Sequence, residues 1–479
     1  MRQVLLCLSL FLFLACGGSN ATSQSTDAGP VDRGPSESPN IRVDVTGFAP
    51  EGALLIGQVA EQQYRAAEAT TDGNAAVFQR EEPFPAGHYY VYYPNGQGVQ
   101  VLITEDQTFS ITAESANPVE TMQATGSEEN RLLYEALRYE LNQQPEFSRI
   151  AQALRAATNG SDEYARLQEE RRQLVGTRGA FQEELFAQAP NSLFTAYKRA
   201  GRNPQLREIR LPTGAMDEQA QVTAFRYDFW DGVNFNDERL LRTPVIFNKL
   251  KRFVTELTPQ NADSIKAAAD FLLTKVLDKP EYFKFIANWI TLQYEPGKST
   301  VMDAEAIHVH MIQNYFTRER AFWSDSMTVW GLQDRASQMA NSLVGQAGPN
   351  VVVPGLDGKP KPLYDLKKPY VAVFMYNPEC EHCIEQTPKL TQAYSKLRDQ
   401  LDVYAIALDT DKEKWQNFVR QYGLTPFTNV FDPTNRTIFK TYYVDNTPEL
   451  YLLNPDRKIV AKNLKVEQLA EAIRLDQSR

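Results

Sequence analysis

The chain has 479 residues, of which 42% are hydrophobic, and its formal net charge at pH 7 is −10. This length is enough for two to four domains, each with a hydrophobic core of its own. Acidic and basic residues are interspersed, so we expect neither a basic face for nucleic acid nor electrostatic attraction to an anionic membrane surface.

The N-terminus has the form of an export signal. A short basic start, Met1-Arg2, precedes an apolar run from Val4 to Ala15, which is shorter than the about twenty residues needed to span a bilayer. The run ends at Cys16, and small residues before a cysteine resemble a bacterial lipobox. That resemblance implies a lipoprotein signal peptide over residues 1–16, with lipid attached to Cys16. The alternative is an ordinary secretory peptide cut near Ala15.

Residues 17–40 are rich in Gly, Ser and Pro, which is typical of a flexible linker. A lipid anchor followed by such a tether predicts a protein of the bacterial cell envelope, held at the membrane and facing the periplasm. An Asp directly after the lipidated cysteine would resemble an inner-membrane retention signal. This chain has Gly17-Gly18 at that place, which slightly favours the outer membrane. No later stretch is long and apolar enough to form a transmembrane helix.

Residues 41–126 predict a small antiparallel β domain of the sandwich type. Its strands are short, rich in β-branched and aromatic residues, and separated by turn signals such as Asp72-Gly73-Asn74. The predicted strands are Val43–Phe48, Ala53–Val59, Ala75–Gln79, His88–Tyr93, Val99–Ile103 and Phe109–Thr112.

Residues 127–345 predict an α-helical domain. Leu133, Leu137 and Leu141 recur at helical spacing, and Thr243-Pro244 is a typical helix start. Further predicted helices are Ile265–Leu277, Tyr282–Tyr294 and Ala304–Tyr315.

Two polar groups in this region resemble binding sites, although a structural role is favoured for each. His308 and His310 are two apart on a predicted helix, so their rings point roughly 200° apart and cannot share one metal ion. Asp228, Trp230 and Asp231 suit a ligand site, but a helix end with an aromatic side chain in the core is the simpler interpretation.

From residue 346 to 479 the chain alternates strand and helix. The predicted order, β-α-β-α-β-β-α, is that of a thioredoxin-like fold. The predicted elements are the strand Tyr370–Tyr376, the helix Cys383–Leu397, the strand Val403–Leu408, the helix Lys412–Tyr422, the hairpin strands Leu450–Leu453 and Lys458–Lys462, and the helix Val466–Leu475.

A Cys-x-x-Cys pair, Cys380 and Cys383, lies between the first strand and the first helix of this domain. The other two of the four cysteines, Cys7 and Cys16, belong to the N-terminal segment, so this pair holds the thiols of the soluble body. Such a pair is typical of a thiol–disulfide redox centre. Zinc and a static disulfide are the alternatives; structural zinc takes four ligands and no second pair is present. We therefore predict no metal and no cofactor.

Each cysteine has a predicted role. A thiol at a helix N-terminus meets unpaired N–H groups and the positive end of the helix dipole, which favour the thiolate. Cys380 is therefore expected to attack a substrate disulfide, and Cys383, further along the helix, to resolve the mixed disulfide. The Pro-x-x-x-Thr/Ser-x-x spacing of peroxiredoxins precedes neither cysteine.

Residues 346–479 resemble the membrane-anchored thioredoxin-like proteins of the TlpA/ResA type. The resemblance rests on the preceding strand, Cys380-x-x-Cys383, Pro388, and Thr447-Pro448 before a strand. It implies that Pro448 is a cis-proline facing the sulfurs and that the Thr447 backbone pairs with substrate. Residues 41–343 also resemble the β-then-helical upstream region of lipoproteins that carry this domain.

Several residues depart from the family pattern. Glu379 replaces a tryptophan, Phe374 replaces a buried acid, and Glu381 and His382 replace Gly and Pro between the cysteines. Protonated His382 would stabilise the Cys380 thiolate and the two glutamates would oppose it, so the direction of the redox reaction stays open. Glu449, after Pro448, is either a determinant of substrate choice or an exposed charge at the strand entry.

The favoured function is a thiol–disulfide oxidoreductase that reduces disulfides of cysteine-containing envelope proteins. The TlpA/ResA resemblance implies the reductase direction and an electron donor across the membrane, such as a transmembrane thiol carrier. The alternative is a non-enzymatic lipoprotein that binds a partner or ligand through residues 41–343, with a regulatory redox pair. An oxidase or isomerase remains a third possibility.

Overall fold

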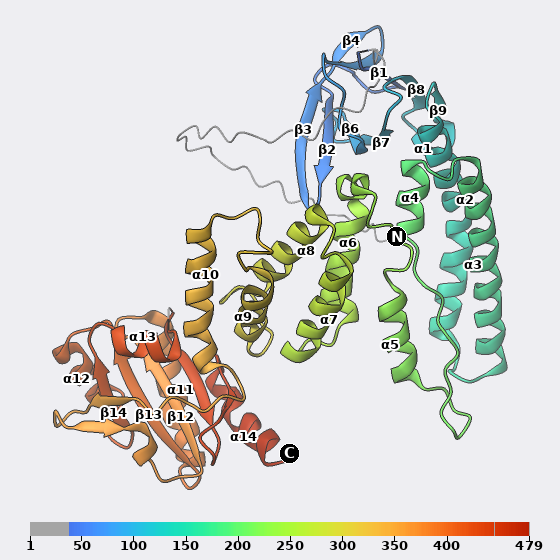
Figure 1. Ribbon diagram of the computed structural model, residues 1–479. Coiled ribbons are helices and arrows are strands. Elements are labelled where there is room, and N and C mark those ends of the chain that lie inside the picture. The colour runs from blue at the N-terminus through green and yellow to red at the C-terminus, as the bar shows by residue number, and fades with distance from the viewer. Residues whose placement is uncertain (1–37, 445, 479) are drawn as a thin grey trace.

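The computed structural model describes residues 38–444 and 446–478. The predicted signal peptide, Cys16 and nearly all of the predicted linker lie outside the described residues. Figure 1 shows a β domain at one end, helices in the middle and an α/β domain at the other end. None of the helices within the described ranges is long and apolar enough to cross a membrane.

The N-terminal domain is built from two β-sheets that share one core. The strand order is β4-β5-β1-β8-β9 in the five-stranded sheet and β3-β2-β6-β7 in the four-stranded sheet. Alternate side chains of β1, such as Ile41 and Val43, join Leu55 and Val91 of the second sheet in that core, as the two-residue period of a strand requires. The strands are β1 (Asn40–Thr46), β2 (Leu54–Val59), β3 (Gln62–Glu68), β4 (Thr70–Asp72), β5 (Ala75–Gln79), β6 (Gly87–Tyr92), β7 (Gly98–Ile103), β8 (Thr108–Glu114) and β9 (Gln123–Thr125).

The structure corrects two parts of the predicted β domain. The prediction of an antiparallel sheet is wrong for β1 and β8, which pair in parallel from Asn40↔Thr108 to Thr46↔Glu114. These strands are far apart in the chain, so no hairpin imposes antiparallel pairing. Strands β3, β4 and β9 were not predicted; β3 is a polar edge strand without a fully buried residue, and such strands carry a weak hydrophobic pattern.

The predicted helical domain is present. It begins where Ser127 accepts a hydrogen bond from the Asn130 N–H and caps the first long helix, an arrangement typical of a helix N-terminus. Thr243 likewise caps the helix that begins at Pro244. The helices are α1 (Pro118–Thr121), α2 (Glu128–Ala156), α3 (Asp162–Gln188), α4 (Leu193–Ala200), α5 (Glu218–Asp228), α6 (Pro244–Arg252), α7 (Ala262–Lys275), α8 (Pro280–Gln293), α9 (Ala304–Tyr315) and α10 (Ser326–Met339).

The structural interpretation of the two polar groups is confirmed. Trp230 is 1% exposed and its ring lies 5.7 Å from that of Phe253. The histidine rings reach different partners: His308 Nδ1 lies 3.1 Å from the Thr291 carbonyl oxygen, and His310 Nε2 lies 2.7 Å from Asp270 Oδ1.

Asn130 joins the β domain to the helical domain. Its amide oxygen accepts a hydrogen bond from the Leu102 N–H at 2.8 Å, and its amide nitrogen donates to the Leu102 carbonyl at 2.8 Å. The side chain is fully buried and pairs with the edge strand β7 as a further strand would. This contact fixes the start of α2 against the β domain.

We expect Asn130→Ala to lower the free energy of unfolding by about 2–4 kcal/mol, because both backbone groups of Leu102 would lose their partner in a buried place. The first unfolding transition in urea measures this loss. Asn142→Ala is the matched control, since Asn142 lies on the same helix and is exposed. Equal stability of the two variants would contradict the prediction.

The C-terminal domain has a central five-stranded sheet of order β14-β13-β12-β15-β16. Strands β12, β13 and β14 run parallel, whereas β15 and β16 run antiparallel to their neighbours. The elements are β10 (Val352–Pro354), β11 (Pro360–Pro362), β12 (Tyr370–Tyr376), α11 (Glu381–Leu397), β13 (Leu401–Leu408), α12 (Lys412–Gln421), β14 (Thr428–Asp432), α13 (Arg436–Tyr442), β15 (Glu449–Leu453), β16 (Ile459–Ala461) and α14 (Leu469–Gln477).

Every residue of β12 is buried because both faces of the sheet are covered. One set of alternate residues, including Phe374, packs with Cys383 of α11 and with residues of α12 and α14. The other set, including Val373, packs with Tyr442 of α13. The sheet therefore forms the middle layer of the thioredoxin-like domain.

The predicted order of this domain lacked the short paired strands β10 and β11 and also β14 and α13, and is corrected here. Elements β14 and α13 are short, and β14 contains the polar residues Asn429 and Asp432. The Asn429 amide donates to the carbonyls of two loop residues before the strand, and the Asp432 carboxylate accepts from the N–H groups of Thr437 and Ile438. These polar residues serve local turns and so obscure the apolar pattern of a strand.

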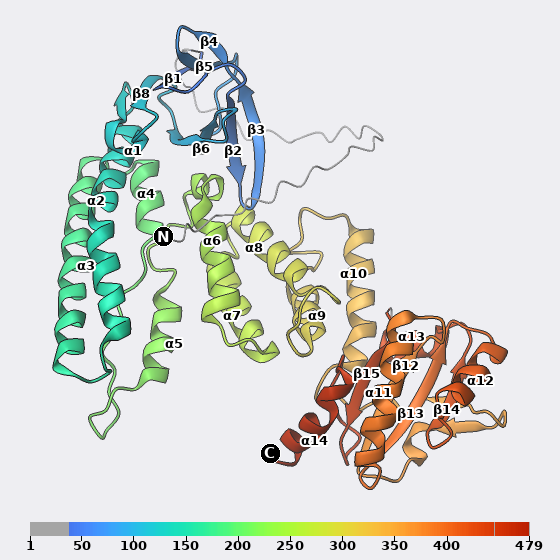
Figure 2. The same cartoon turned by 180° about the vertical axis from the view of Figure 1, so that it is seen from behind.

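The thioredoxin-like domain is docked on the helical domain through α10 and α13, which lie side by side in Figures 1 and 2. The Arg335 Nε–H donates to the Tyr443 hydroxyl at 2.8 Å, and the Ser342 hydroxyl donates to the Tyr442 carbonyl at 2.8 Å. This interface lies directly before the loop that carries Pro448.

Candidate functional site

The turn after β12 places Cys380 at the start of α11. Cys380 Sγ accepts a hydrogen bond from the Cys383 N–H at 3.4 Å and so caps the helix. Asn377 holds the turn, because its Oδ1 accepts from the Glu379 N–H at 2.8 Å and its Nδ2 donates to the Asp409 carbonyl at 3.0 Å. The sequence analysis missed Asn377, although an Asn before a Pro is a common turn signal.

The two thiols, which are both free, have different environments. Cys380 is partly exposed, whereas Cys383 is fully buried. For Cys380, burial acts to raise the pKa, but hydrogen bonds from the Cys383 thiol and from backbone N–H groups outweigh it and lower the pKa from its usual 9.0. Burial, with a contribution from Cys380, raises the pKa of Cys383 to about 12. The accessible thiol is therefore also the more acidic one.

The loop with Thr447 and Pro448 lies against this pair. The Thr447–Pro448 peptide bond is cis, and the Cys380 thiol lies 3.2 Å from the Thr447 carbonyl oxygen, to which it donates. The fold thus brings Thr447 next to Cys380, although the two are far apart in the sequence. This contact is expected from the family resemblance. That Thr447 and Pro448 bind substrate stays a prediction.

The acidic residues next to Cys380 differ in their surroundings. Glu379 forms an ion pair with Lys414 at 2.9 Å, and both side chains are about half exposed. Lys414 is a second residue that sequence analysis missed, since it lies on α12. Glu381 and His382 are exposed, and their side-chain charges are not among the main causes of the Cys380 pKa shift. Their tuning role stays a prediction.

An aromatic stack lies beside Cys383, where the family resemblance suggests a buried acid. Phe374 is 1% exposed, and its ring lies 5.2 Å from that of Tyr376 with 12° between the planes. The Tyr376 ring is 5.0 Å from that of Phe418. These rings belong to the same buried cluster as Cys383, and an apolar environment disfavours its thiolate.

One of the two interpretations of Glu449, an exposed charge at the strand entry, is wrong. Glu449 is half-buried and lies with Tyr451 and Lys462 around a small cavity at the border with the helical domain. Hydrogen bonding and charge from Glu449 add to burial in raising the pKa of Tyr451. The residue after Pro448 therefore contacts the domain interface.

This geometry suits thiol–disulfide exchange. In such an exchange the Cys380 thiolate can attack one sulfur of a substrate disulfide, which forms a mixed disulfide and releases the other sulfur as a thiolate. Cys383, after losing its proton, can then attack Cys380 Sγ, which forms the Cys380–Cys383 disulfide and releases the substrate as a dithiol. These roles of the two cysteines stay predictions. One disulfide is reduced for each dithiol oxidised.

Comparison with known proteins agrees with this chemistry. The AhpC/TSA family matches residues 344–462. The chain is 35% identical over 121 residues to the thiol-disulfide oxidoreductase ResA of Bacillus cereus, covering 25% of this chain and 68% of that protein. It is 33% identical over 132 residues to the ResA of Bacillus thuringiensis subsp. konkukian, covering 27% and 74% of the two chains.

A solved structure is similar over a longer part of the chain. It is a thioredoxin-like protein from Bacteroides caccae, with 17% identity and a TM-score of 0.47, covering 58% of this chain and all of that one. The residues that the AhpC/TSA family model matches lie in the C-terminal domain that carries Cys380 and Cys383. Through this domain the chain belongs to the ResA-type, thioredoxin-like family of thiol–disulfide oxidoreductases.

Proposed function

We propose that the protein is a lipid-anchored reductase of the bacterial envelope, which reduces disulfides of exported proteins through Cys380 and Cys383. The observation that carries this proposal is the asymmetry of the pair. Cys380 is accessible and has a lowered pKa, whereas Cys383 is fully buried and has a pKa of about 12. A nucleophile and a resolving thiol require this difference.

The high pKa of Cys383 supports the reductase direction. Strong oxidants of this fold owe their oxidising power to a stabilised reduced form, in which a thiolate is favoured. Here burial disfavours the thiolate of Cys383, which favours a dithiol that gives up its electrons. The lowered pKa of Cys380 acts in the opposite sense, and the proposed direction follows the ResA-type relatives. Regeneration then needs a thiol electron donor, for which a transmembrane carrier is the proposed source.

Cys383→Ser is expected to accumulate a mixed disulfide between Cys380 and client proteins, because the resolving thiol is gone while the nucleophile remains. Non-reducing gel electrophoresis followed by mass spectrometry measures the adducts. The double variant Cys380→Ser/Cys383→Ser is the control and should form none. Adducts that persist in the double variant would show that Cys380 is not the attacking residue.

The proposed anchor is lipidated Cys16, outside the described residues. We expect Cys16→Ala to move the protein from the membrane fraction to the soluble fraction, because the lipid chains would be lost. Immunoblots of fractionated cells measure this, and separated inner and outer membranes test the preference for the outer membrane. Unchanged membrane association of the variant would exclude Cys16 as the anchor.

A further inference from the structure

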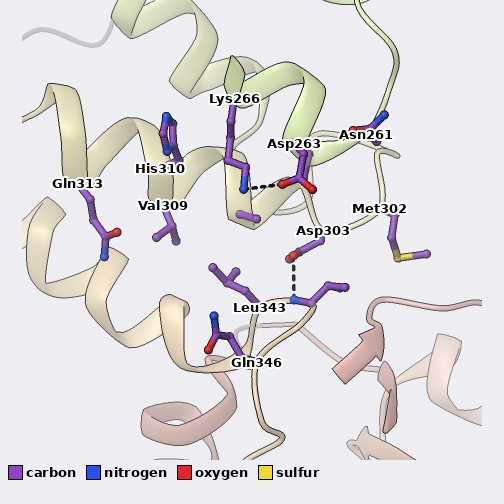
Figure 3. Close-up of a pocket in the computed structure, with 13 residues that line it drawn as sticks. Asn261, Asp263, Lys266, Met302, Asp303, Val309, His310, Gln313, Leu343 and Gln346 are labelled. Atoms are coloured by element: carbon purple, nitrogen blue, oxygen red, sulfur yellow. Dashed lines mark hydrogen bonds and ion pairs between the residues drawn. The ribbon is translucent and has the colours of Figure 1, made fainter. Parts of the chain in front are cut away.

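The thioredoxin-like domain contacts the helical domain at several places besides α10. The buried Lys462 Nζ lies 3.8 Å from Glu305 and 3.9 Å from Asp303. In Figure 3 the Asp303 carboxylate also accepts a hydrogen bond from the segment that connects the domains, at the Val344 N–H. The Asn463 amide donates to Glu305 at 2.7 Å. The two domains therefore share a defined interface.

Tyr443 anchors the thioredoxin-like domain in this interface. It is 6% exposed and belongs to the buried core of the β and helical domains, not to either core of its own domain. Its ring centre lies 4.8 Å from that of Phe439. Its hydroxyl accepts the hydrogen bond from Arg335 of α10 at 2.8 Å. The helical domain therefore holds this side chain both by packing and by a hydrogen bond.

The backbone at Tyr443 also depends on its surroundings. Its φ angle is 58°, in the left-handed region that a bulky residue rarely adopts. Such a conformation persists where neighbouring contacts determine it. The Asn435 amide donates to the carbonyl of the next residue, Val444, at 2.8 Å. The direction in which the chain leaves α13 is therefore set by contacts on both sides of Tyr443.

Both ends of the loop that carries Thr447 meet the helical domain. Tyr443 before the loop and Glu449 after it line the same small cavity, together with residues of the helical domain such as Ser342. Between these two ends, the Thr447 carbonyl oxygen accepts a hydrogen bond from the Cys380 thiol at 3.2 Å. The interface thus bounds the loop that lies against the nucleophilic cysteine.

We propose that α10 positions the redox site: Arg335 holds Tyr443, and Tyr443 holds the Thr447 loop in place beside Cys380. Arg335 and Tyr443 act through the loop and are therefore positioning residues. The helical domain then serves the reaction by presenting an ordered loop to a substrate polypeptide. This inference rests on the proposed reduction of protein disulfides, in which the Thr447 backbone pairs with the substrate.

Kinetics of insulin reduction test the proposal in three variants. Arg335→Ala removes the hydrogen-bond donor and should raise KM about threefold, with kcat within about twofold of the wild-type value. Tyr443→Asn removes the anchoring ring, while asparagine still adopts the left-handed conformation, and should raise KM at least about tenfold. The double variant should not exceed Tyr443→Asn alone, because Arg335 acts through Tyr443. Effects on KM that multiply would contradict this relation.

A second substrate and a control variant separate positioning from a general loss of structure. The small disulfide 5,5′-dithiobis(2-nitrobenzoate) is too short to extend along the loop. Its rate constant with the reduced variants should stay within about twofold of the wild-type value. Arg318→Ala, the same substitution at an exposed position of the helical domain, should leave KM for insulin unchanged.

Two results would refute the positioning role. One is a wild-type KM for insulin in both Arg335→Ala and Tyr443→Asn. The other is an equal loss of rate with insulin and with the small disulfide, which would assign these residues a general structural role. A wild-type protein that reacts with the small disulfide but does not turn over insulin would contradict the proposed function itself, and this inference with it.

Discussion

Replacing Cys380 by serine should lower the turnover of a protein disulfide by at least about a thousandfold, because the nucleophile itself is removed. The thiolate, not the thiol or a hydroxyl, attacks a disulfide sulfur. Reduction of insulin with dithiothreitol as electron source measures the rate. The fold should survive, since Cys380 is the N-cap of α11 and serine is a good N-cap residue.

This result also separates the two functions considered from the sequence. If the pair only regulates binding by residues 41–343, the wild-type protein has no turnover to lose. Turnover that persists in Cys380→Ser would show that the reduction does not pass through this thiol. Glu413→Gln is a suitable control, because Glu413 is exposed on α12 and the nucleophile remains.

The second large effect is selective alkylation. In the reduced protein at pH 7, iodoacetamide should modify Cys380 at least about fiftyfold faster than Cys383. A pKa below 9.0 against one of about 12 gives at least about a thousandfold more thiolate on Cys380. The Cys383 thiolate is the more basic of the two and is therefore intrinsically about twentyfold more reactive. This reduces the expected difference in alkylation rate to about fiftyfold. The full burial of Cys383 widens the difference further.

Quenched time courses followed by peptide mass spectrometry give both rates. The rate at Cys380 should rise about tenfold per pH unit and then level off as the pH passes the Cys380 pKa, which is lowered from 9.0. Cys383→Ser is the control that reports Cys380 alone. Equal rates at the two cysteines, or faster labelling of Cys383, would contradict the assigned roles.

The sequence was most informative where burial is complete. The apolar run Tyr370–Tyr376 coincides with β12, because a strand covered on both faces has no polar positions to interrupt it. The helix Ala304–Tyr315 was likewise predicted with the ends it has. Polar and edge elements such as β3 and β14 were missed, since exposure or local hydrogen bonding removes the periodic signal.

Long-range relations were beyond the sequence pattern. Nothing in the β1 and β8 sequences indicates that they pair in parallel. The two cysteines were recognised because they are close in sequence, and Thr447 and Pro448 were added by family resemblance. Lys414, which pairs with Glu379, and Asp303, which meets Lys462, come from distant elements. Only the fold brings such side chains together, and their separate local patterns are those of ordinary surface or loop residues.

The reduction potential of the Cys380–Cys383 pair tests the central claim most directly. It is measured by equilibrating the protein in glutathione and dithiothreitol buffers, alkylating the free thiols and quantifying the products by mass spectrometry. A reductase predicts a value near that of thioredoxin, about −270 mV. A value near that of the strong oxidant DsbA, about −120 mV, would contradict the proposal and indicate a protein that introduces disulfides.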